Sequence, residues 1–298
     1  MAKPFVKWAG GKGKLLPTLE ANLPLDFNMQ QEVTYIEPFV GGGAMLFYML
    51  EKYPNIRRII INDINLGLIN CYRTIKDNHR ALISELSQLH NKFYELESIE
   101  EKRSLYYSLR DEYNMIPVDE RNTIRTAALF VFFNRTCFNG LYRENNQGNF
   151  NVPYGKYVRP NICNEQVVTD AHNVLQQVEI LHGNYANVLE LVDWNEYNFF
   201  YLDPPYRPLL KAKNFKQYTM NAFGDQEQEE LKEFCDIINN HRGYFMLSNS
   251  NSILESGVNY FEDLYNRYNV QQINAPRRIN AYAQGSQMAT EILVKNYD

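Results

Sequence analysis

The chain has 298 residues, and 45% of them are hydrophobic, which is enough for a large core and excludes a disordered protein. Its 30 lysines and arginines are outnumbered by 35 aspartates and glutamates, giving a net charge of −5. An acidic total argues against a polyanionic partner, because nucleic-acid affinity comes largely from neutralised phosphates. Two local stretches are nevertheless basic, residues 207–216 and Arg277–Arg278, so one face of the molecule can still be positive.

Composition and spacing also predict the cellular setting. Residues 1–4 lead into no apolar segment, so we expect no secretory signal. The longest apolar run, residues 127–133, is too short to cross a bilayer, so no membrane partner is expected. The scattered cysteines favour reduced thiols in a cytoplasmic protein. Neither they nor the histidines have the spacing of metal ligands, so no metal is expected.

Short apolar segments predict the strands of a buried, largely parallel sheet. They recur along the chain at residues 34–36, 58–61, 198–202, 244–247 and 291–294. Helical patterns separate them. One helix should begin with a capping box formed by Asp225 and Gln228, continue through an apolar face at Leu231, Phe234, Cys235 and Ile238, and be stopped by Gly243, which follows it. This alternation predicts an α/β fold with helices on both faces of the sheet.

The middle of the chain has a different composition. Residues 69–113 and 121–133 predict helices with no strand between them. Residues 139–160, which are rich in Asn, Gly and Tyr, predict a loop or hairpin. Because this region separates two α/β portions, it indicates an inserted, mostly helical subdomain.

A glycine-rich turn follows the first predicted strand. Its residues 37–43, Glu-Pro-Phe-Val-Gly-Gly-Gly, allow a sharp turn and a close approach of the backbone to a ligand. Asp63 ends the next strand, where a carboxylate is placed to accept hydrogen bonds from ribose hydroxyls. Leu46 occupies the position of the third glycine of a dinucleotide fingerprint, which favours an adenosine-containing cofactor other than NAD. A tight turn without a ligand is the alternative.

Residues 5–12, Phe-Val-Lys-Trp-Ala-Gly-Gly-Lys, contain a Gly-Lys pair without the rest of a phosphate-binding loop. The first glycine of that motif is missing, and Gly13 replaces the Ser or Thr that would hold magnesium. We therefore reject a phosphate-binding loop. The aromatic, glycine and lysine residues of this segment are suited to enclose an anionic group such as an amino-acid carboxylate.

The most informative segment is Asp203-Pro204-Pro205-Tyr206, directly after the predicted strand 198–202. The adenine amino group is a poor nucleophile because its lone pair is delocalised into the ring. The Asp203 carboxylate and the Pro204 carbonyl can accept its N–H groups and favour a more nucleophilic nitrogen. The prolines stiffen the loop, and stacking on Tyr206 would contribute about 1–3 kcal/mol. A base must leave the duplex to reach such a pocket, and an ordinary proline-rich turn is the alternative.

With these three elements in order, the chain resembles the Dam-type family of DNA adenine-N6 methyltransferases. The matching motifs span nearly the whole chain, at residues 5–12, 38–43, 63–65, 133–143, 150–157, 203–206, 248–250 and 291–293. The resemblance implies a Rossmann-like, S-adenosylmethionine-dependent methyltransferase sheet. Its catalytic domain would comprise residues 1–65 and 164–298, interrupted by a mostly helical target-recognition domain at residues 66–163.

The resemblance also implies which residues form the site. S-adenosylmethionine, the implied cofactor, would be bound by Trp8, Lys12, Gly41, Asp63, Asn184, Tyr185 and Asp203. The catalytic residues, which hold the flipped adenine, would be Asp203, Pro204, Pro205 and Tyr206. Contacts with duplex DNA would come from Lys7, Arg135, Phe138, Asn139, Leu141, Arg143, Pro153 and Tyr157.

Within the DNA-contacting set, Phe138 would insert beside Asn139 near the emptied position. Leu141 and Arg143 would face base edges, and arginine makes the commonest specific contact with guanine. The set resembles that of members that methylate the adenine of GATC, so GATC is the predicted target. For Arg143, an ion pair with Glu144 or another carboxylate in a solvated loop is the alternative interpretation.

The expected reaction is a direct, in-line methyl transfer without a metal or a covalent enzyme intermediate, in which Asp203 stabilises the developing positive nitrogen. Three alternatives stay open: an RNA adenine substrate, the N4 amino group of cytosine, and a catalytically silent DNA-binding protein. We expect a monomer or a weak dimer. A cognate restriction endonuclease is a candidate partner that no residue of the sequence reveals.

Overall fold

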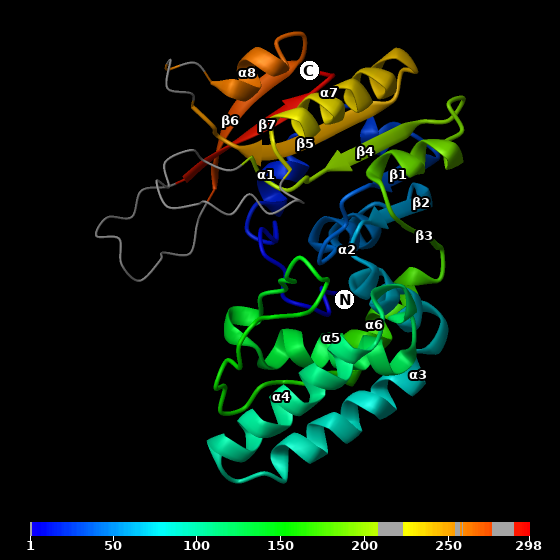
Figure 1. The fold of residues 1–298 in the computed structure, drawn as a ribbon. Helices are drawn as coiled ribbons and strands as arrows, with labels where there is room; N and C mark the ends of the chain where they lie inside the picture. Colours follow the sequence, from blue (N-terminus) through cyan, green and yellow to red (C-terminus); the bar gives the residue numbers. More distant parts are fainter. Residues whose placement is uncertain (1, 208–222, 254–256, 258, 276–288) are drawn as a thin grey trace. The chain divides into compact units, whose positions relative to one another are not determined.

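The computed structural model describes residues 2–207, 223–253, 257, 259–275 and 289–298 (Figure 1). Of the two basic stretches in the sequence, Arg207 lies in this part, whereas residues 208–216 and Arg277–Arg278 lie outside the described residues. Backbone contacts group the chain into two compact units. The first comprises Met1–Gly11, Val40–Lys52 and Ile61–Asn187, and the second comprises Lys12–Phe39, Tyr53–Ile60 and Val188–Asp298. An inserted domain with boundaries at residues 66 and 163 stays a prediction.

The described strands form a seven-stranded sheet in the order β3-β2-β1-β4-β5-β7-β6 (Figure 1). Their bounds are β1 Val33–Glu37, β2 Ile56–Asp63, β3 Val178–His182, β4 Asn198–Leu202, β5 Tyr244–Ser250, β6 Asn269–Ala275 and β7 Ala289–Lys295. β4 pairs in parallel with both β1 and β5, whereas β7 runs antiparallel to both β5 and β6. The predicted α/β, Rossmann-like fold class is confirmed.

All five predicted strands are present, as β1, β2, β4, β5 and β7. The two strands that the sequence did not indicate, β3 and β6, are the two edges of the sheet. β4, in the interior of the sheet, is buried at every position, whereas three of the five residues of β3 are only half-buried and one is exposed. An edge strand needs no continuous apolar run, so apolar patterning detects it poorly.

The helices lie between the strands in chain order (Figure 1). The α-helices are α1 Leu16–Glu20, α2 Ala44–Lys52, α3 Leu66–Tyr94, α4 Ile99–Met115, α5 Ile124–Thr136, α6 Glu165–Leu175, α7 Asp225–Asn240 and α8 Tyr260–Leu264. Short 3₁₀ helices are η1 Phe27–Met29, η2 Val118–Glu120, η3 Phe138–Gly140 and η4 Tyr185–Leu191.

Two helices, α3 and α4, replace the single helical stretch predicted over residues 69–113. Ser98 starts the second one, because its hydroxyl accepts from Glu101 N at 3.1 Å while Glu101 Oε2 accepts from Ser98 N at 3.0 Å. α5 packs against both α3 and α4. Its aromatic residues Phe130, Phe132 and Phe133 are at most 1% exposed, as expected for a helix in the core.

Helix α7 of the second unit packs on β5, but its ends differ from the prediction. Its first turn is capped by Glu227, whose Oε2 accepts from Gly224 N at 2.8 Å, so the expected box of Asp225 and Gln228 is wrong. Those two side chains bond to Arg207 and to the Pro205 carbonyl instead. The left-handed residue after the helix is Arg242, with φ 61°, and not Gly243.

Candidate active site

The glycine turn of the first unit is fixed by the carboxylate at the end of β2. Gly41 N donates to Asp63 Oδ2 at 3.0 Å, and Asn65 N donates to Asp63 Oδ1 at 2.9 Å. Burial raises the pKa of Asp63, while these backbone hydrogen bonds act in the opposite direction. Tyr72 Oη donates to the Gly41 carbonyl at 3.0 Å. The glycine turn is therefore fixed by hydrogen bonds to the Asp63 carboxylate and to the Tyr72 hydroxyl.

Trp8 lies directly against this turn. A β-carbon built on Gly41 or Gly42 would lie 2.8 or 2.9 Å from the Trp8 side chain, so only glycine permits the contact. The indole also stacks with Tyr142 at a centroid distance of 6.1 Å and an interplanar angle of 20°. The structure thus brings together three predicted cofactor residues that are far apart in sequence, Trp8, Gly41 and Asp63.

Replacing Gly43 with alanine is expected to lower the free energy of unfolding by about 1–3 kcal/mol, the range for a strained backbone position. Gly43 has φ 74°, and its β-carbon would lie 2.5 Å from Tyr72 Oη. Urea unfolding of the variant measures the effect. Gly13→Ala is the control, since nothing lies within 4 Å of the added carbon. Equal unfolding midpoints for the two variants would contradict the inferred strain.

The predicted residues Asn184 and Tyr185 follow β3 beside the same carboxylate. Gly183 N donates to the Asp63 carbonyl at 3.1 Å, and Asn62 Nδ2 donates to the Gly183 carbonyl at 3.0 Å. Asn184 is exposed and its Oδ1 accepts from Ala186 N at 2.8 Å, while Tyr185 is half-buried and begins η4. Five of the seven predicted cofactor residues therefore belong to one connected part of the first unit.

The tetrapeptide Asp203–Tyr206 begins where β4 ends, in the second unit. Asp203 Oδ1 accepts from Ser248 Oγ at 3.1 Å and lies 3.1 Å from Lys12 Nζ. Burial raises the pKa of Asp203 to about 6, although Lys12 and the Ser248 hydrogen bond lower it. A carboxylate in this state is still ionised at neutral pH and is a strong acceptor for N–H groups.

Lys12 belongs to this cluster, although the sequence assigned it to the cofactor. The side chain is 4% exposed, and Nζ lies 3.1 Å from Glu291 Oε2 and 4.4 Å from the centroid of the Tyr206 ring. Lys12 Nζ also donates to the Tyr206 hydroxyl, which in turn donates to Glu291 Oε2 at 2.7 Å. One ammonium, two carboxylates and one phenol therefore form a closed network.

Two further contacts fix the tetrapeptide loop. The fully buried Gln228 donates from Nε2 to the Pro205 carbonyl at 3.4 Å and accepts from Asn249 at 3.2 Å. The next residue, Arg207, bonds to both carboxylate oxygens of Asp225, at 2.6 and 3.1 Å, and to Ser252 Oγ at 2.9 Å. The loop is thus anchored to α7 and to the end of β5 before any ligand binds.

The predicted DNA-contacting residues lie mainly in a loop of the first unit, residues 137–154, which we name the reading loop. Cys137 and Tyr154 form a bridge that closes it, and Glu144 and Phe150 form a second one. Phe138 and Leu141 expose 52% and 40% of their surface. Asn139, Arg143 and Pro153 are also exposed. This set presents apolar and hydrogen-bonding groups together.

Three predicted residues support or border the reading loop. Lys7 Nζ lies 4.7 Å from the centroid of Tyr157, and Lys7 N donates to Asn134 Oδ1 at 2.7 Å. Arg135 is half-buried and donates to the Phe5 carbonyl at 2.6 Å, so it anchors the N-terminal segment. Burial lowers the pKa of Arg135. Lys7 and Tyr157 thus adjoin the loop, while Arg135 is engaged beneath it.

Arg143 is exposed and donates from Nε to Asn151 Oδ1 at 2.7 Å. The ion pair between Arg143 and Glu144 considered for the sequence is not the contact found. Glu144 instead lies 3.6 Å from Arg121. The Asn151 bond orients the Arg143 guanidinium across the loop.

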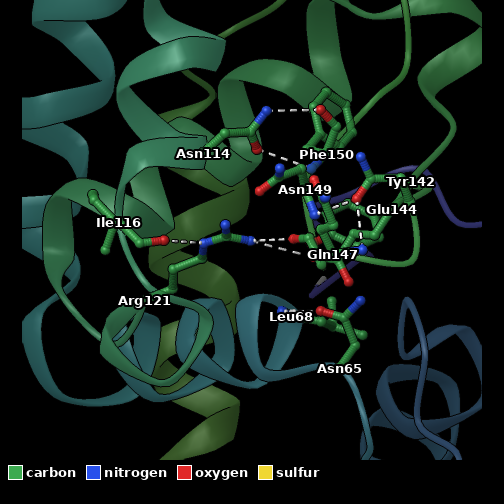
Figure 2. Close-up of polar contacts among 12 residues, drawn as sticks. Asn65, Leu68, Asn114, Ile116, Arg121, Tyr142, Glu144, Gln147, Asn149 and Phe150 are labelled. Carbon is green, nitrogen blue, oxygen red and sulfur yellow. Dashed lines mark hydrogen bonds and ion pairs between the residues drawn. The ribbon is translucent and has the colours of Figure 1, made fainter.

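Two side chains, the buried Arg121 and the half-buried Asn114, brace the reading loop (Figure 2). Arg121, 2% exposed, donates to the carbonyls of Ile116 and Gly148 at 3.0 and 2.7 Å. Asn114 makes a two-way bond with the Phe150 backbone, at 2.9 and 3.0 Å. The turn at the tip of the loop therefore has a fixed conformation.

Comparison with known proteins identifies the family. The model of the D12 class N6 adenine-specific DNA methyltransferases matches residues 8–279. The chain belongs to this family. The type II methyltransferase M.MjaIII of Methanocaldococcus jannaschii is 41% identical to it over 296 residues, 99% of each chain. M1.LlaDCHI of Lactococcus lactis subsp. cremoris is 34% identical over 99% of this chain and 95% of its own. The DNA adenine methylase of Escherichia coli K12 is 28% identical over 98% and 94%.

This methyltransferase contains functional candidates that its sequence did not reveal. Glu291 directly precedes the apolar run of β7, and a carboxylate in such a predicted strand was the available signal; in the structure it is only 7% exposed. Arg121 gave no signal, because its partners lie in a loop whose conformation the sequence does not specify. In the described part of the chain, no helix combines the length and apolar character needed to cross a membrane.

Proposed function

We propose that this methyltransferase transfers the methyl group of S-adenosylmethionine to N6 of adenine in GATC, within duplex DNA, after the adenine has flipped out of the helix. The main support is the surroundings of Asp203. Its carboxylate, together with the Tyr206 ring, already holds one nitrogen cation, that of Lys12, at 3.1 Å from the carboxylate and 4.4 Å from the ring centroid. An acceptor combined with an aromatic face suits an amino group that gains positive charge during the reaction.

The glycine turn supports S-adenosylmethionine as the cofactor. Asp63 Oδ1 and Oδ2 each accept one backbone N–H, and a carboxylate oxygen has a second lone pair available for a ribose hydroxyl. The absence of side chains at Gly41 and Gly42 lets the Trp8 indole lie directly against the turn, beside the space proposed for the cofactor. We assign Trp8, Gly41, Asp63, Asn184 and Tyr185 to the cofactor.

When bound, S-adenosylmethionine supplies a methyl group that is already activated by its sulfonium. Asp203 and the Pro204 carbonyl accept the two N–H groups of the adenine and orient the N6 lone pair for in-line attack. The Asp203 carboxylate would stabilise the positive charge that N6 gains when it accepts the methyl group, until N6 loses a proton. The loop is anchored in advance by Gln228 and Arg207, so little ordering is required at the moment of reaction.

The reading loop supports base flipping and recognition in the proposed mechanism. Phe138 is an exposed aromatic residue beside Asn139, whose φ of 56° makes a sharp bend that presents the ring. We assign Phe138 to the space left by the flipped adenine, and Leu141 and Pro153 to thymine methyl groups. Arg143 is assigned to a guanine, with Lys7 and Tyr157 near the outer one. Stacking of Phe138 on the neighbouring bases would partly compensate for the pairing and stacking that the flipped adenine loses.

Transfer of labelled methyl groups to duplex oligonucleotides tests the proposal. Labelling is expected for a GATC duplex and not for the same duplex with its adenine replaced, and Asp203→Ala should remove it. Equal labelling of the GATC duplex and of the duplex with its adenine replaced would refute GATC as the target. Preferred labelling of an RNA competitor would refute duplex DNA as the substrate. Two relatives are named type II methyltransferases, which makes a restriction endonuclease with the same target a proposed partner.

A further inference from the structure

Glu291 lies at the centre of the catalytic network without belonging to the tetrapeptide. It projects from β7, where it is paired in register with Ser250 of β5 and Ile273 of β6. The following residues Ile292 and Leu293 are completely buried. A carboxylate in such surroundings is stable only with strong hydrogen-bond donors. Glu291 has two, the ammonium of Lys12 and the hydroxyl of Tyr206.

We propose that Glu291 is a positioning residue for the methyl transfer, which shares the charge of Lys12 and fixes the ring of Tyr206 so that Asp203 stays a strong acceptor. This inference rests on the proposed catalytic role of Asp203 and Tyr206. It adds a residue from a different strand to the machinery and gives it two separable tasks, one electrostatic and one geometric.

The electrostatic task follows from the charges that face Asp203. Lys12 brings one positive charge, and the carboxylates of Asp203 and Glu291, each 3.1 Å from its Nζ, bring two negative ones. The hydroxyls of Ser248, Tyr201 and Tyr206 complete the surroundings, and Glu37 on β1 accepts from Tyr35 at 2.8 Å beyond Tyr201. With Glu291 present, Lys12 cannot neutralise Asp203 completely. The site therefore keeps an excess negative charge for the amino group.

The geometric task follows from the hydrogen bond to Tyr206. The hydroxyl donates to Glu291 Oε2 at 2.7 Å, which fixes the far end of a ring whose near end is fixed by Pro205. The ring must lie parallel to the target base if it is to stack on it. Displacing a catalytic group by about 1 Å can reduce a rate about a hundredfold.

The test is Glu291→Gln, which keeps the size of the side chain and removes its charge. Genomic DNA without prior methylation serves as substrate, because it contains every short target sequence. We expect kcat to fall about tenfold, within the range for a slightly displaced catalytic group, with a smaller change in KM. The acidic limb of the kcat profile should move to lower pH. The negative charge of Glu291 raises the pKa of Asp203, so its removal lets Asp203 ionise at lower pH.

A second readout does not require activity. The titration of the Asp203 carboxyl, followed by carbon NMR and assigned with Asp203→Asn, should have a lower midpoint in Glu291→Gln than in the wild type. Glu291→Asp keeps the charge, so it should retain the wild-type midpoint and recover part of kcat. Glu196→Gln is the matched control, since its carboxylate accepts from Thr34 outside the network.

Equal Asp203 midpoints in the wild type and Glu291→Gln would overturn the inference, as would a wild-type kcat at every pH. A Glu291→Asp variant no better than Glu291→Gln would overturn it as well. If the wild type itself methylates no DNA, the proposed function fails, and the NMR midpoints still decide whether Glu291 controls Asp203. Circular dichroism confirms that each variant is folded.

Discussion

Replacing Asp203 with asparagine is expected to reduce the rate of methyl transfer about 10²- to 10³-fold, the usual effect of removing one electrostatic contact to a developing charge. Asparagine keeps the shape of the side chain and removes the negative charge that stabilises the positive N6. The fold should survive, because Lys12 retains Glu291 as a partner at 3.1 Å. Single-turnover transfer of labelled methyl groups, with circular dichroism of the same sample, measures both properties.

The pH dependence gives this prediction a second signature. Burial raises the pKa of Asp203 to about 6, and only the ionised carboxylate carries the negative charge that would stabilise a positive N6. The wild-type rate of methyl transfer should therefore be maximal above this pH and fall as the pH drops through it. The rate of the asparagine variant should not show this fall at acidic pH. Asp236→Asn is the control, because Asp236 bonds to Lys232 and Tyr268 away from the tetrapeptide. An asparagine variant at position 203 that is nearly as fast as the wild type would refute the catalytic assignment.

Replacing Arg143 with alanine should weaken recognition of one guanine by about 1–3 kcal/mol, the value of a good bidentate contact between arginine and a base. At 1.4 kcal/mol for each factor of ten, this is a loss of roughly 5- to 150-fold in discrimination. Nε of Arg143 is bonded to Asn151, and we assign the two terminal nitrogens to the guanine. The measurement is the ratio of kcat/KM for a GATC duplex and for one with that guanine replaced.

Two further variants separate recognition from general attraction to DNA. Arg159 is an exposed arginine outside the reading loop, so Arg159→Ala should weaken both duplexes equally and leave the ratio unchanged. Asn151→Ala should release the Arg143 side chain and reduce the ratio by a smaller factor. If Arg143→Ala leaves the ratio at its wild-type value, Arg143 does not read this base.

The sequence predicts the interior of the fold better than its borders. Strands β1, β2, β4, β5 and β7 lie inside the sheet, with a neighbouring strand on each side, and they carry apolar runs. The edge strands β3 and β6 have a neighbour on one side only and do not need such runs. The boundary between α3 and α4 depends on a single capping side chain, Ser98, within a stretch that is helical on both sides. The start of α7 shifted by one residue because Asp225 and Gln228 serve other partners.

For the candidate site, local motifs were informative and distant partners were not. The glycine turn, Asp63 and the tetrapeptide each lie at the end of a predicted strand, so their position follows from the strand pattern. Lys12 and Glu291 are 279 residues apart in the sequence, and no local pattern indicates that the Lys12 ammonium donates a hydrogen bond to the Glu291 carboxylate. The family resemblance assigned Lys12 to the cofactor, together with Trp8. In the fold Lys12 contacts Asp203, Tyr206 and Glu291, and its contact with the cofactor stays a prediction.

The brace beneath the reading loop determines how sequence specificity could be exchanged between relatives. The buried Arg121 and the half-buried Asn114 support the loop, and both precede it in the chain. Transplanting residues 137–154 alone into a relative would transfer the side chains proposed to contact bases without Arg121 and Asn114, which fix the loop. Moving residues 114–154 as one piece would carry both. If the loop contacts DNA as proposed, recognition is a property of this transferable block, in which Arg121 and Asn114 fix the shape of the loop and its exposed side chains contact the bases.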